Sequence, residues 1–295
     1  MAAMGKARLI YCLIVFSTTF FPVFAGAGNL KIGVISNKPV DMIKNCNPMA
    51  RYLECRLKGL GITGVKVVVA KDIPEMVQWV KKEVVDIVFE TAFATVVMRE
   101  EAGMIPKLLV WKKGVKQYVT LFFVRNDSPM TNLKDLAGKT LAFESPNSTS
   151  AYLIPKAELR LLGLTVIPLE GRARKNAVNY VFAGRDINQT FQVIQKKADA
   201  GAFNSNDWDE LPEKIKAELK IIHESKPIIR FIASFHPSLS GKLQEALINH
   251  LVQMDKEPDG IKALQSASRI SKIERLTDED LKSLDYVKNL MKVIE

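Results

Sequence analysis

Short apolar runs alternate with amphipathic segments over the first part of the chain. Strand-like runs occupy residues 30–36 (LKIGVIS), 65–70 (VKVVVA), 86–90 (DIVFE) and 106–112 (PKLLVWK). The segments between them, residues 47–61, 73–83 and 91–103, place apolar residues at helical spacing, and the first has Asn47 as its cap and Pro48 in its first turn. Strands that alternate with helices predict an open, mainly parallel sheet covered by helices on both faces.

A second α/β pattern begins at Gln117. Residues 117–128 (QYVTLFFVRNDS) form a long β-rich run, and residues 227–234 (PIIRFIAS) form a returning run that mirrors it. Strand-like and helical segments alternate between them, and the chain after residue 234 is predicted to be helical to its end. This pattern predicts two crossover strands that join two lobes, the first from residues 26–117 with 235–295 and the second from residues 118–234. Such a connection makes a hinge, with the ligand cleft between the lobes at the strand ends.

The stretch SPNSTS, from Ser145 to Ser150, lies between a strand-like run and a helix-like run. The first N–H groups of a helix have no partner within it, and the helix dipole adds partial positive charge there. Ser148, Thr149 and Ser150 add three hydroxyl groups at the same place, so the motif indicates an oxyanion site. Two alternatives stay open: an ordinary helix cap, and a nucleophilic serine, although the stretch lacks the G-x-S-x-G pattern of hydrolases.

The first 25 residues have the layout of a secretory signal peptide. Lys6 and Arg8 precede an apolar run from Leu9 to Phe24, and small residues follow at a cleavage point before Gly26 or Gly28. A membrane anchor is the alternative, but the run is shorter than the roughly 20 apolar residues that a span needs. An exported, periplasmic protein is therefore expected.

Composition and charge narrow the choice of partners. The chain has 295 residues, of which 47% are hydrophobic and 25% charged, which fits two lobes of ordinary size. The net charge of +10 is spread along the chain without interleaved aromatic residues, so nucleic acid is not expected as a partner. Cys46 and Cys55 are expected to be free thiols, because nine residues of helical rise would separate their sulfurs. The isolated histidines offer no metal-ligand spacing, and no metal or other cofactor is expected.

The segment from Tyr118 through FFVRNDSPMTNLKDLAGKTLAFESPNSTSAYLIPKAELRLLGL resembles the phosphonate-binding family of periplasmic substrate-binding proteins. The resemblance extends over residues 30–264, and the Ser-Thr-Ser block after DL-GK is its specific part. It implies a two-lobed periplasmic-binding-protein-like α/β fold. It also implies a protein without catalysis of its own, which closes on a phosphonate, phosphite or phosphate-like oxyanion and delivers it to an ABC permease in the inner membrane. A monomer is expected.

Three positions depart from the family pattern. Arg185 replaces the usual His before Asp186, where a guanidinium could hold an oxyanion through two hydrogen bonds or could point into solvent. Phe93 replaces a Tyr, and Glu90 and Thr91 precede it where the family has Gly-Pro; Glu90 could recognise an amine or serve only the helix start. Ala151 stands in place of the Gly after Ser-Thr-Ser.

The remaining candidates stand at strand ends. Tyr118 begins the first crossover run where the family has a cleft tyrosine, and Asn204 ends the strand-like run at residues 198–203; packing and helix capping are the alternative roles. The expected ligand-binding set is Ser148, Thr149, Ser150, Tyr118, Arg185, Asp186, Phe93, Thr91 and Asn204, with no catalytic residue. Two other functions stay open: a binding protein that signals to a membrane receptor, and an exported hydrolase.

Overall fold

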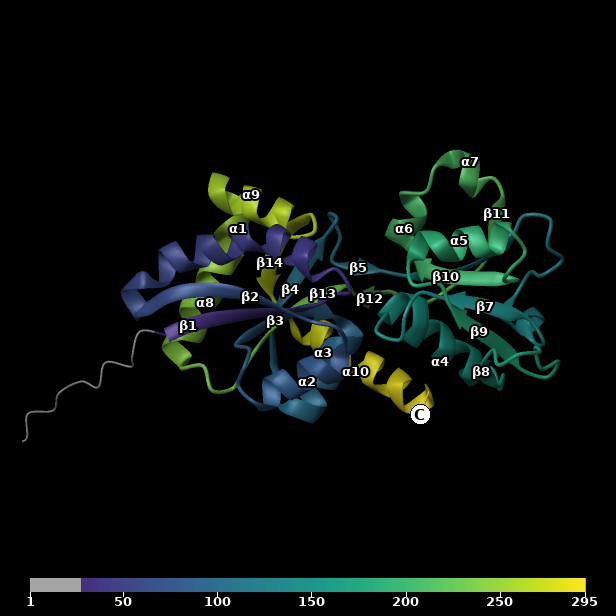
Figure 1. Ribbon diagram of the computed structural model, residues 1–295, viewed down its shortest axis with the longest axis horizontal. Helices are drawn as coiled ribbons and strands as arrows, with labels where there is room; N and C mark the ends of the chain where they lie inside the picture. The colour runs from purple at the N-terminus through teal and green to yellow at the C-terminus, as the bar shows by residue number, and fades with distance from the viewer. Residues whose placement is uncertain (1–27, 295) are drawn as a thin grey trace, which may run out of the picture.

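Two six-stranded sheets lie side by side and are joined by a thin waist in the computed structural model, which describes residues 28–294 (Figure 1). The first sheet has the order β14-β4-β13-β3-β1-β2 and is built from β1 (Gly28–Ile35), β2 (Ile62–Ala70), β3 (Ile87–Thr91), β4 (Ile105–Lys112), β13 (Phe231–Phe235) and β14 (Ile270–Arg275). The second has the order β11-β6-β10-β7-β9-β8 and is built from β6 (Thr120–Arg125), β7 (Thr140–Phe143), β8 (Val166–Pro168), β9 (Val178–Phe182), β10 (Ala200–Asn204) and β11 (Leu219–Glu224). The predicted two-lobed α/β fold is confirmed. The predicted leader, residues 1–25, lies outside the described residues.

The two predicted crossover strands are present at the waist. β5 (Gln117–Tyr118) and β12 (Ile228–Ile229) pair antiparallel, with Tyr118 opposite Ile228. Each continues directly into a strand of a large sheet, β5 into β6 and β12 into β13. The segment that leaves the first lobe and the segment that returns to it therefore lie side by side. The predicted residue boundaries of the two lobes stay a prediction.

Both sheets are more mixed than a mainly parallel sheet. In the first, β3, β1 and β2 run parallel, whereas β13 pairs antiparallel with β3 and β4, and β14 with β4. In the second, β10, β7, β9 and β8 run parallel, whereas β6 pairs antiparallel with β10 and β11. All of these antiparallel pairs except β4 with β14 involve β6 or β13, the two strands that enter their sheets straight from the waist.

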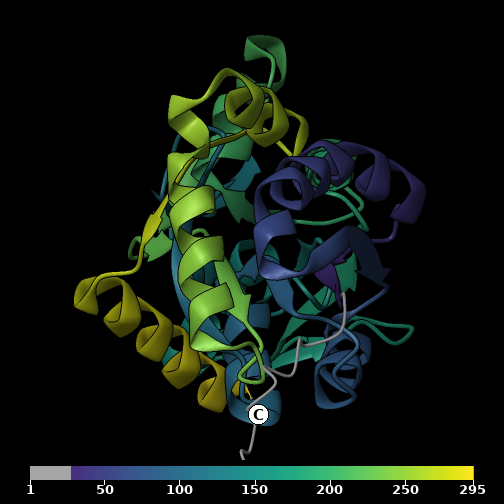
Figure 2. The same cartoon turned by 90° about the vertical axis from the view of Figure 1, so that its left-hand side faces the viewer.

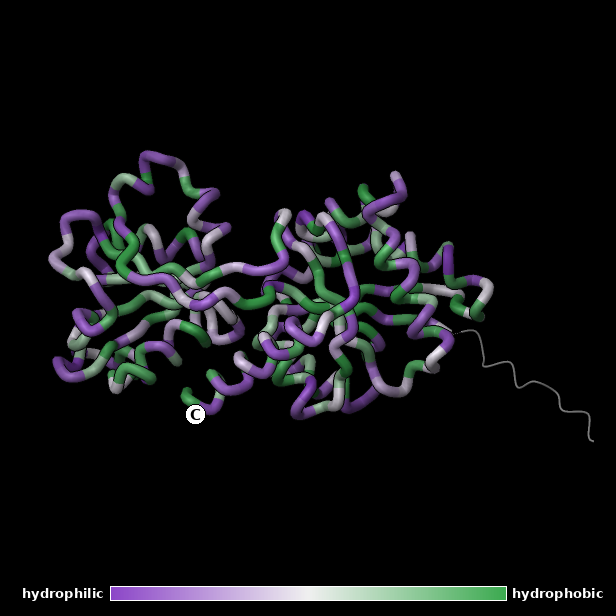
Figure 3. Tube along the Cα trace, turned by 180° about the vertical axis from the view of Figure 1, so that it is seen from behind, coloured by the Kyte–Doolittle hydropathy of each residue, from purple (hydrophilic) through white to green (hydrophobic). Residues whose placement is uncertain are grey.

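Helices cover both faces of the first sheet. The helices of this lobe are α1 (Pro39–Leu57), α2 (Ile73–Lys81), α3 (Ala92–Ala102), α8 (Gly241–Gln253) and α9 (Pro258–Ser266). One apolar core joins α1, α8 and α9 to the sheet, and another joins α2 and α3 to it. Figure 2 views this lobe with α8 in front. The second lobe carries α4 (Ile154–Leu161), α5 (Asp186–Ile194), α6 (Ser205–Asp209) and α7 (Glu213–Lys216). Figure 3 shows hydrophobic segments inside both lobes.

The last helix, α10 (Asp278–Ile294), packs against both lobes. It contacts α3 of the first lobe, β12 at the waist and α4 of the second lobe. Its residues Leu284, Val287 and Leu290 are buried in one apolar cluster with Val96 of α3 and Ile154 of α4. The two lobes therefore share an apolar core behind the crossover strands. Within residues 28–294 no helix is both long enough and apolar enough for a membrane crossing.

Two predicted elements are wrong. Helix α1 begins at Pro39, not after an Asn47 cap, and Pro48 lies inside it. Because Pro48 has no N–H, the carbonyl of Lys44 lacks its hydrogen bond within the helix, but Lys44 is exposed. Burial of the apolar face of α1 offsets that loss.

The chain after residue 234 is not helical throughout, because β14 adds an edge strand to β4. Its charged residues, in the sequence ISKIER, obscured the strand pattern, although they suit an exposed sheet edge. Cys46 and Cys55 are free, as predicted.

The second lobe depends on a close approach at Gly201 of β10. Gly201 pairs with Phe123 of β6, and a Cβ at this position would collide with the Phe123 ring. Phe123 in turn contacts the ring of Phe203, with 4.5 Å between ring centroids. We expect Gly201→Ala to lower the free energy of unfolding by about 1–3 kcal/mol, measured by denaturant titration. Gly241→Ala is the matched control, because no atom lies within 4 Å of a Cβ there. Equal stability of the two variants would contradict this packing.

Candidate ligand-binding cleft

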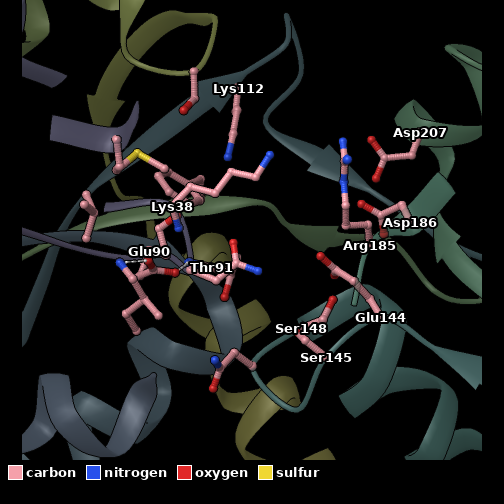
Figure 4. A pocket seen from close by; sticks show the side chains of 18 of the residues that line it. Lys38, Glu90, Thr91, Lys112, Glu144, Ser145, Ser148, Arg185, Asp186 and Asp207 are labelled. Carbon is pink, nitrogen blue, oxygen red and sulfur yellow. Dashed lines mark hydrogen bonds between the residues drawn. The ribbon is translucent and has the colours of Figure 1, made fainter. Parts of the chain in front are cut away.

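A cleft of about 760 Å³ lies between the two lobes, and several strands end at it. Its first-lobe wall includes residues that follow β1, end β3 and end β4, and its second-lobe wall includes residues that follow β7, β9 and β10. This position agrees with the general rule that ligands of open α/β sheets bind beyond the carboxyl ends of strands. Figure 4 shows the polar side chains that face each other across it.

The structure brings four of the nine predicted site residues to the lining of the cleft. Thr91, Ser148, Arg185 and Asp186 line it. The other five, which are Thr149, Ser150, Tyr118, Phe93 and Asn204, lie behind the lining residues. The binding role of all nine residues stays a prediction.

The SPNSTS loop is fastened to the first lobe by its own side chains. The Phe93 N–H at the start of α3 donates a hydrogen bond to Thr149 Oγ1 over 3.1 Å. The Ile73 N–H at the start of α2 donates to Asn147 Oδ1 over 3.4 Å. Side-chain oxygens of the second lobe therefore accept hydrogen bonds from two helix starts of the first lobe, where backbone donors have no partner within their helices.

Ser148 caps the helix that follows the loop. Its Oγ accepts a hydrogen bond from the Ala151 N–H over 3.1 Å, and the first turn, Thr149–Leu153, is a π-helix that continues into α4. The backbone carbonyl of Ser150 accepts a hydrogen bond from Thr120 Oγ1 over 3.0 Å. The helix start thus points at the cleft through Ser148, while Thr149 and Ser150 are buried at the contact between lobes.

Tyr118 lies beneath the same loop at the waist. Burial raises the pKa of its phenol to about 12, although the nearby charge of Arg230 and the hydroxyl groups of Ser150 and Thr149 oppose this shift. The Arg230 guanidinium carbon lies 5.5 Å from the centroid of the Tyr118 ring. Tyr118 therefore remains neutral, and it packs beneath the SPNSTS loop.

Phe93 and Asn204 have mainly structural surroundings. Phe93 packs between the apolar clusters of α3 and α10. Asn204 caps α6, because its Oδ1 accepts a hydrogen bond from the Asp207 N–H over 3.1 Å, and its Nδ2 donates to the Asp207 carboxylate over 2.6 Å. Asn204 therefore fixes the position of Asp207, which does line the cleft.

Glu90 and Thr91 stand together where β3 meets α3. The Glu90 carboxylate accepts hydrogen bonds from the Ile35 N–H over 2.7 Å and from the Thr91 N–H over 3.0 Å. Burial raises the pKa of Glu90 to about 7 against the effect of these two hydrogen bonds. The Thr91 Oγ1 is buried and has no hydrogen-bond partner among the described residues, although it stands before α3 as its cap residue. This hydroxyl therefore lies unpaired just beneath the lining of the cleft.

Basic side chains from both lobes enter the cleft. Lys38, directly before α1, and Lys112, at the end of β4, line the first-lobe side, and Arg185 lines the second. In Figure 4 the ammonium groups of Lys38 and Lys112 point to the same part of the cleft. Burial and the nearby charge of Arg230 lower the pKa of Lys112. No sequence motif marks Lys38 or Lys112, although Lys38 directly precedes a helix and Lys112 ends a strand.

Three carboxyl groups gather on the second-lobe side. Glu144 ends the run before the SPNSTS loop, Asp186 starts α5 and Asp207 lies in α6 (Figure 4). Burial, followed by the charges of Glu144 and Asp207, raises the pKa of Asp186 to about 8. Burial also raises the pKa of Glu144, against a hydrogen bond from Ser148. Asp186 therefore holds a proton at neutral pH, and a protonated carboxyl can donate a hydrogen bond to an oxyanion.

Ion pairs cross the mouth of the cleft. The Lys113 ammonium lies 2.9 Å from Asp207 and 2.7 Å from Glu210, and Arg269 lies 2.9 Å from Glu210. Lys113 and Arg269 belong to first-lobe loops, whereas Asp207 and Glu210 belong to α6 and its end. Nearby, Arg230 donates a hydrogen bond to the Asn206 side chain. These pairs hold the rim of the second lobe against the first.

The histidines lie away from the cleft. His223 pairs with Glu158 over 2.9 Å and His236 contacts Ser238 over 2.6 Å, and none of His223, His236 and His250 lines the cleft. Ser148 therefore has no histidine base beside it. Among residues 28–294 there is no cluster of three or more His, Cys, Asp or Glu side chains arranged to hold a metal ion.

Two α/β lobes, a pair of crossover strands and a polar cleft between them define a two-lobed substrate-binding protein. A family model described as "ABC transporter, phosphonate, periplasmic substrate-binding protein" matches residues 32–281. The chain therefore belongs to the phosphonate family of periplasmic substrate-binding proteins of ABC transporters. This confirms the resemblance found in the sequence, and proteins of this family are transport components, not enzymes.

Relatives of known name agree with this assignment. The phosphonates-binding periplasmic protein of Escherichia coli (strain K12) is 27% identical over 240 residues, which cover 78% of this chain and 67% of that protein. XAC2383 from Xanthomonas citri, solved bound to ATP, has a TM-score of 0.84 and 27% identity, covering 90% of this chain and 99% of that chain. PhnD1 from Prochlorococcus marinus, solved with methylphosphonate, has a TM-score of 0.69, 18% identity and coverages of 90% and 99%, a likeness that shows the fold alone.

The acidic cluster makes the stability of the protein depend on pH. The pKa of Asp186 is near 8 in the folded protein and 3.8 in the absence of the fold, so the folded state binds this proton more tightly. Its contribution to stability is complete below pH 3.8 and is lost as the pH rises to about 8. The melting temperature should therefore fall between pH 5 and pH 8 in the unmodified protein. In Asp186→Asn this fall should be smaller by about 2 °C or more.

The exposed Asp209, in the same lobe, provides the control for this change. Asp209→Asn should leave the pH dependence of the melting temperature as it is in the unmodified protein. The same slope in Asp186→Asn as in Asp209→Asn would show that Asp186 is not buried against other carboxylates.

Proposed function

We propose that this protein binds a phosphonate, phosphite or phosphate-like oxyanion in the cleft and delivers it to an ABC permease of the inner membrane as part of an importer. Its membership of the family supports the transport role, and the leader expected from the sequence supports a periplasmic location. A monomer that carries no cofactor and does not bind nucleic acid is part of the same proposal.

The main support for an anionic ligand is the set of basic side chains in the cleft. Lys38, Lys112 and Arg185 line it, and none of them forms a salt bridge within the described part of the chain. The carboxylates opposite are largely neutralised, because Asp207 pairs with Lys113 and Asp186 is protonated at neutral pH. An oxyanion between the lobes would therefore meet unpaired cations and hydrogen-bond donors.

Helix starts add fixed partial charge to these cations. Ser148 caps the helix of the second lobe at the cleft, and Thr91, with its unpaired hydroxyl, stands before α3 of the first lobe. Phosphorus oxyanions suit such a site because each has several oxygens and each oxygen can accept more than one hydrogen bond. The bound structures of relatives are in keeping with this class, since XAC2383 was solved with ATP and PhnD1 with methylphosphonate.

The mechanism follows from the two-lobed architecture. A ligand that contacts Lys38 and Lys112 on one lobe and Ser148 and Arg185 on the other stabilises the closed arrangement, because it bridges them only when they are close. The permease would then recognise the closed form. A ligand-sensing role with a membrane receptor remains the alternative, and it would use the same cleft. A hydrolase is not supported, because no histidine lies beside Ser148.

A thermal-shift screen tests the ligand class. The purified protein is tested with phosphate, phosphite, methylphosphonate, aminoethylphosphonate, sulfate and simple carboxylates, since a ligand that binds only the folded state raises its melting temperature. A rise with a phosphorus oxyanion that sulfate and carboxylates do not give supports the proposal. No rise with any phosphorus compound would contradict it.

A lysine substitution tests the location of the anion. Lys112→Met retains much of the side-chain bulk but removes the charge, so binding of the best phosphorus oxyanion should weaken by about tenfold or more in calorimetry. Lys66→Met, at an exposed position on β2 of the same lobe, should leave the affinity unchanged. Equal affinities of the two variants would place the anion elsewhere.

A further inference from the structure

The first-lobe wall of the cleft has an apolar part beside its polar part. Part of its lining consists of apolar side chains that lie between α1 and the sheet: Val34, Met42, Cys46, Met49, Phe89 and Phe231. Met49 and Phe89 are each only 3% exposed and belong to the core that α1 forms with the sheet. We call this apolar part of the cleft the chamber: Met42 and Phe231 are partly exposed in it, whereas Met49 and Phe89 form its nearly covered back.

Helix α1 contributes one face of sulfur-containing side chains to this wall. Met42, Cys46 and Met49 are four and three residues apart, which places them on one face of the helix. The Cys46 sulfur lies 3.7 Å from the Met42 sulfur. Thioether side chains adapt to ligands of irregular shape, and a buried thiol behaves as a small apolar group. Burial raises the pKa of Cys46 to about 11, so this wall carries no charge at neutral pH.

The size of the cleft exceeds the need of a bare oxyanion. About 760 Å³ lies within the range of roughly 300–1,000 Å³ that is usual for pockets of drug-sized ligands. The polar groups that would hold the anion stand at the mouth of the chamber: Lys38 directly precedes α1, and the Lys112 ammonium lies 4.5 Å from the centroid of the Phe231 ring. An anion held by these lysines would direct its substituent between α1 and the sheet.

We propose that this chamber is a subsite for an uncharged, apolar substituent, and that the ligand is a phosphonate or phosphate monoester bearing an alkyl chain of several carbons or an aromatic ring. The inference rests on the proposed oxyanion function and adds the class of substituent. The anionic head binds Lys38 and Lys112, and the hydrocarbon part displaces water from the walls formed by Met42, Cys46 and Phe89.

A ligand series tests the subsite with the unmodified protein. Methylphosphonate, butylphosphonate and phenylphosphonate share one head group, so calorimetry on the three compounds isolates the effect of the substituent. Butyl- and phenylphosphonate should bind about tenfold or more tightly than methylphosphonate, because each buried methylene adds to the affinity. Their binding should also have a more negative heat-capacity change, which marks the burial of apolar surface.

Two variants on α1 locate the subsite. Cys46→Leu adds bulk to the chamber wall and should reduce the affinity ratio of butyl- to methylphosphonate by about fivefold or more. Cys55→Leu makes the same change on the exposed side of the same helix and should keep the ratio of the unmodified protein. Melting temperatures check that both variants are folded, and the ratio is measured within each variant, so a general loss of stability does not change it.

The outcomes separate the two proposals. Binding of methylphosphonate that equals or exceeds that of the larger phosphonates would overturn the apolar subsite and leave the oxyanion function intact. An unchanged affinity ratio in a folded Cys46→Leu variant would place the substituent elsewhere and overturn the subsite as well. No binding of any phosphonate or phosphate would overturn both proposals.

Discussion

The arrangement of the cleft depends on the contact between the lobes at the SPNSTS loop, where the Phe93 N–H donates a hydrogen bond to Thr149 Oγ1. This bond joins the start of α3 in the first lobe to the start of the helix in the second. It contributes only about 0.5–1.5 kcal/mol by itself, and the Phe93 ring also packs against the apolar cluster that α10 forms with both lobes. Ser148 and Thr91 stay at the lining, while Thr149 and Ser150 are taken up in the contact between lobes.

The lysines of the cleft lie on the first lobe, whereas Arg185 and a cluster of carboxyl groups lie on the second. Cations of the first lobe face a cluster of carboxyl groups on the second, and the cluster is tolerable only because one member is protonated and another is paired with Lys113. Lys38 and Lys112 therefore form no salt bridge within the described residues. An anion that enters meets unpaired ammonium groups at short range, where the low dielectric constant strengthens the attraction.

Much of the architecture could be predicted from the sequence, because alternating strand and helix patterns and two long β runs report burial directly. Ser148, Arg185 and Asp186 could be located for the same reason, since each follows a strand of the predicted sheet. Lys38, Lys112 and Asp207 could not, because lysine and aspartate are common at any surface and only the folded arrangement gathers them. The predicted start of α1 was wrong because a proline is favoured in the first turn of a helix, whereas Pro48 lies inside α1. Strand β14 was missed because an edge strand rich in charge resembles a loop.

The apolar core that α10 shares with both lobes limits how the lobes can move. Leu284, Val287 and Ile154 are buried in it, so a motion that pulled α10 away from α4 would expose apolar surface and cost free energy. A rotation that keeps α10 in contact with α3 and α4 would leave this surface covered. The core therefore favours rotation of one lobe about the crossover strands over translation of one lobe away from the other.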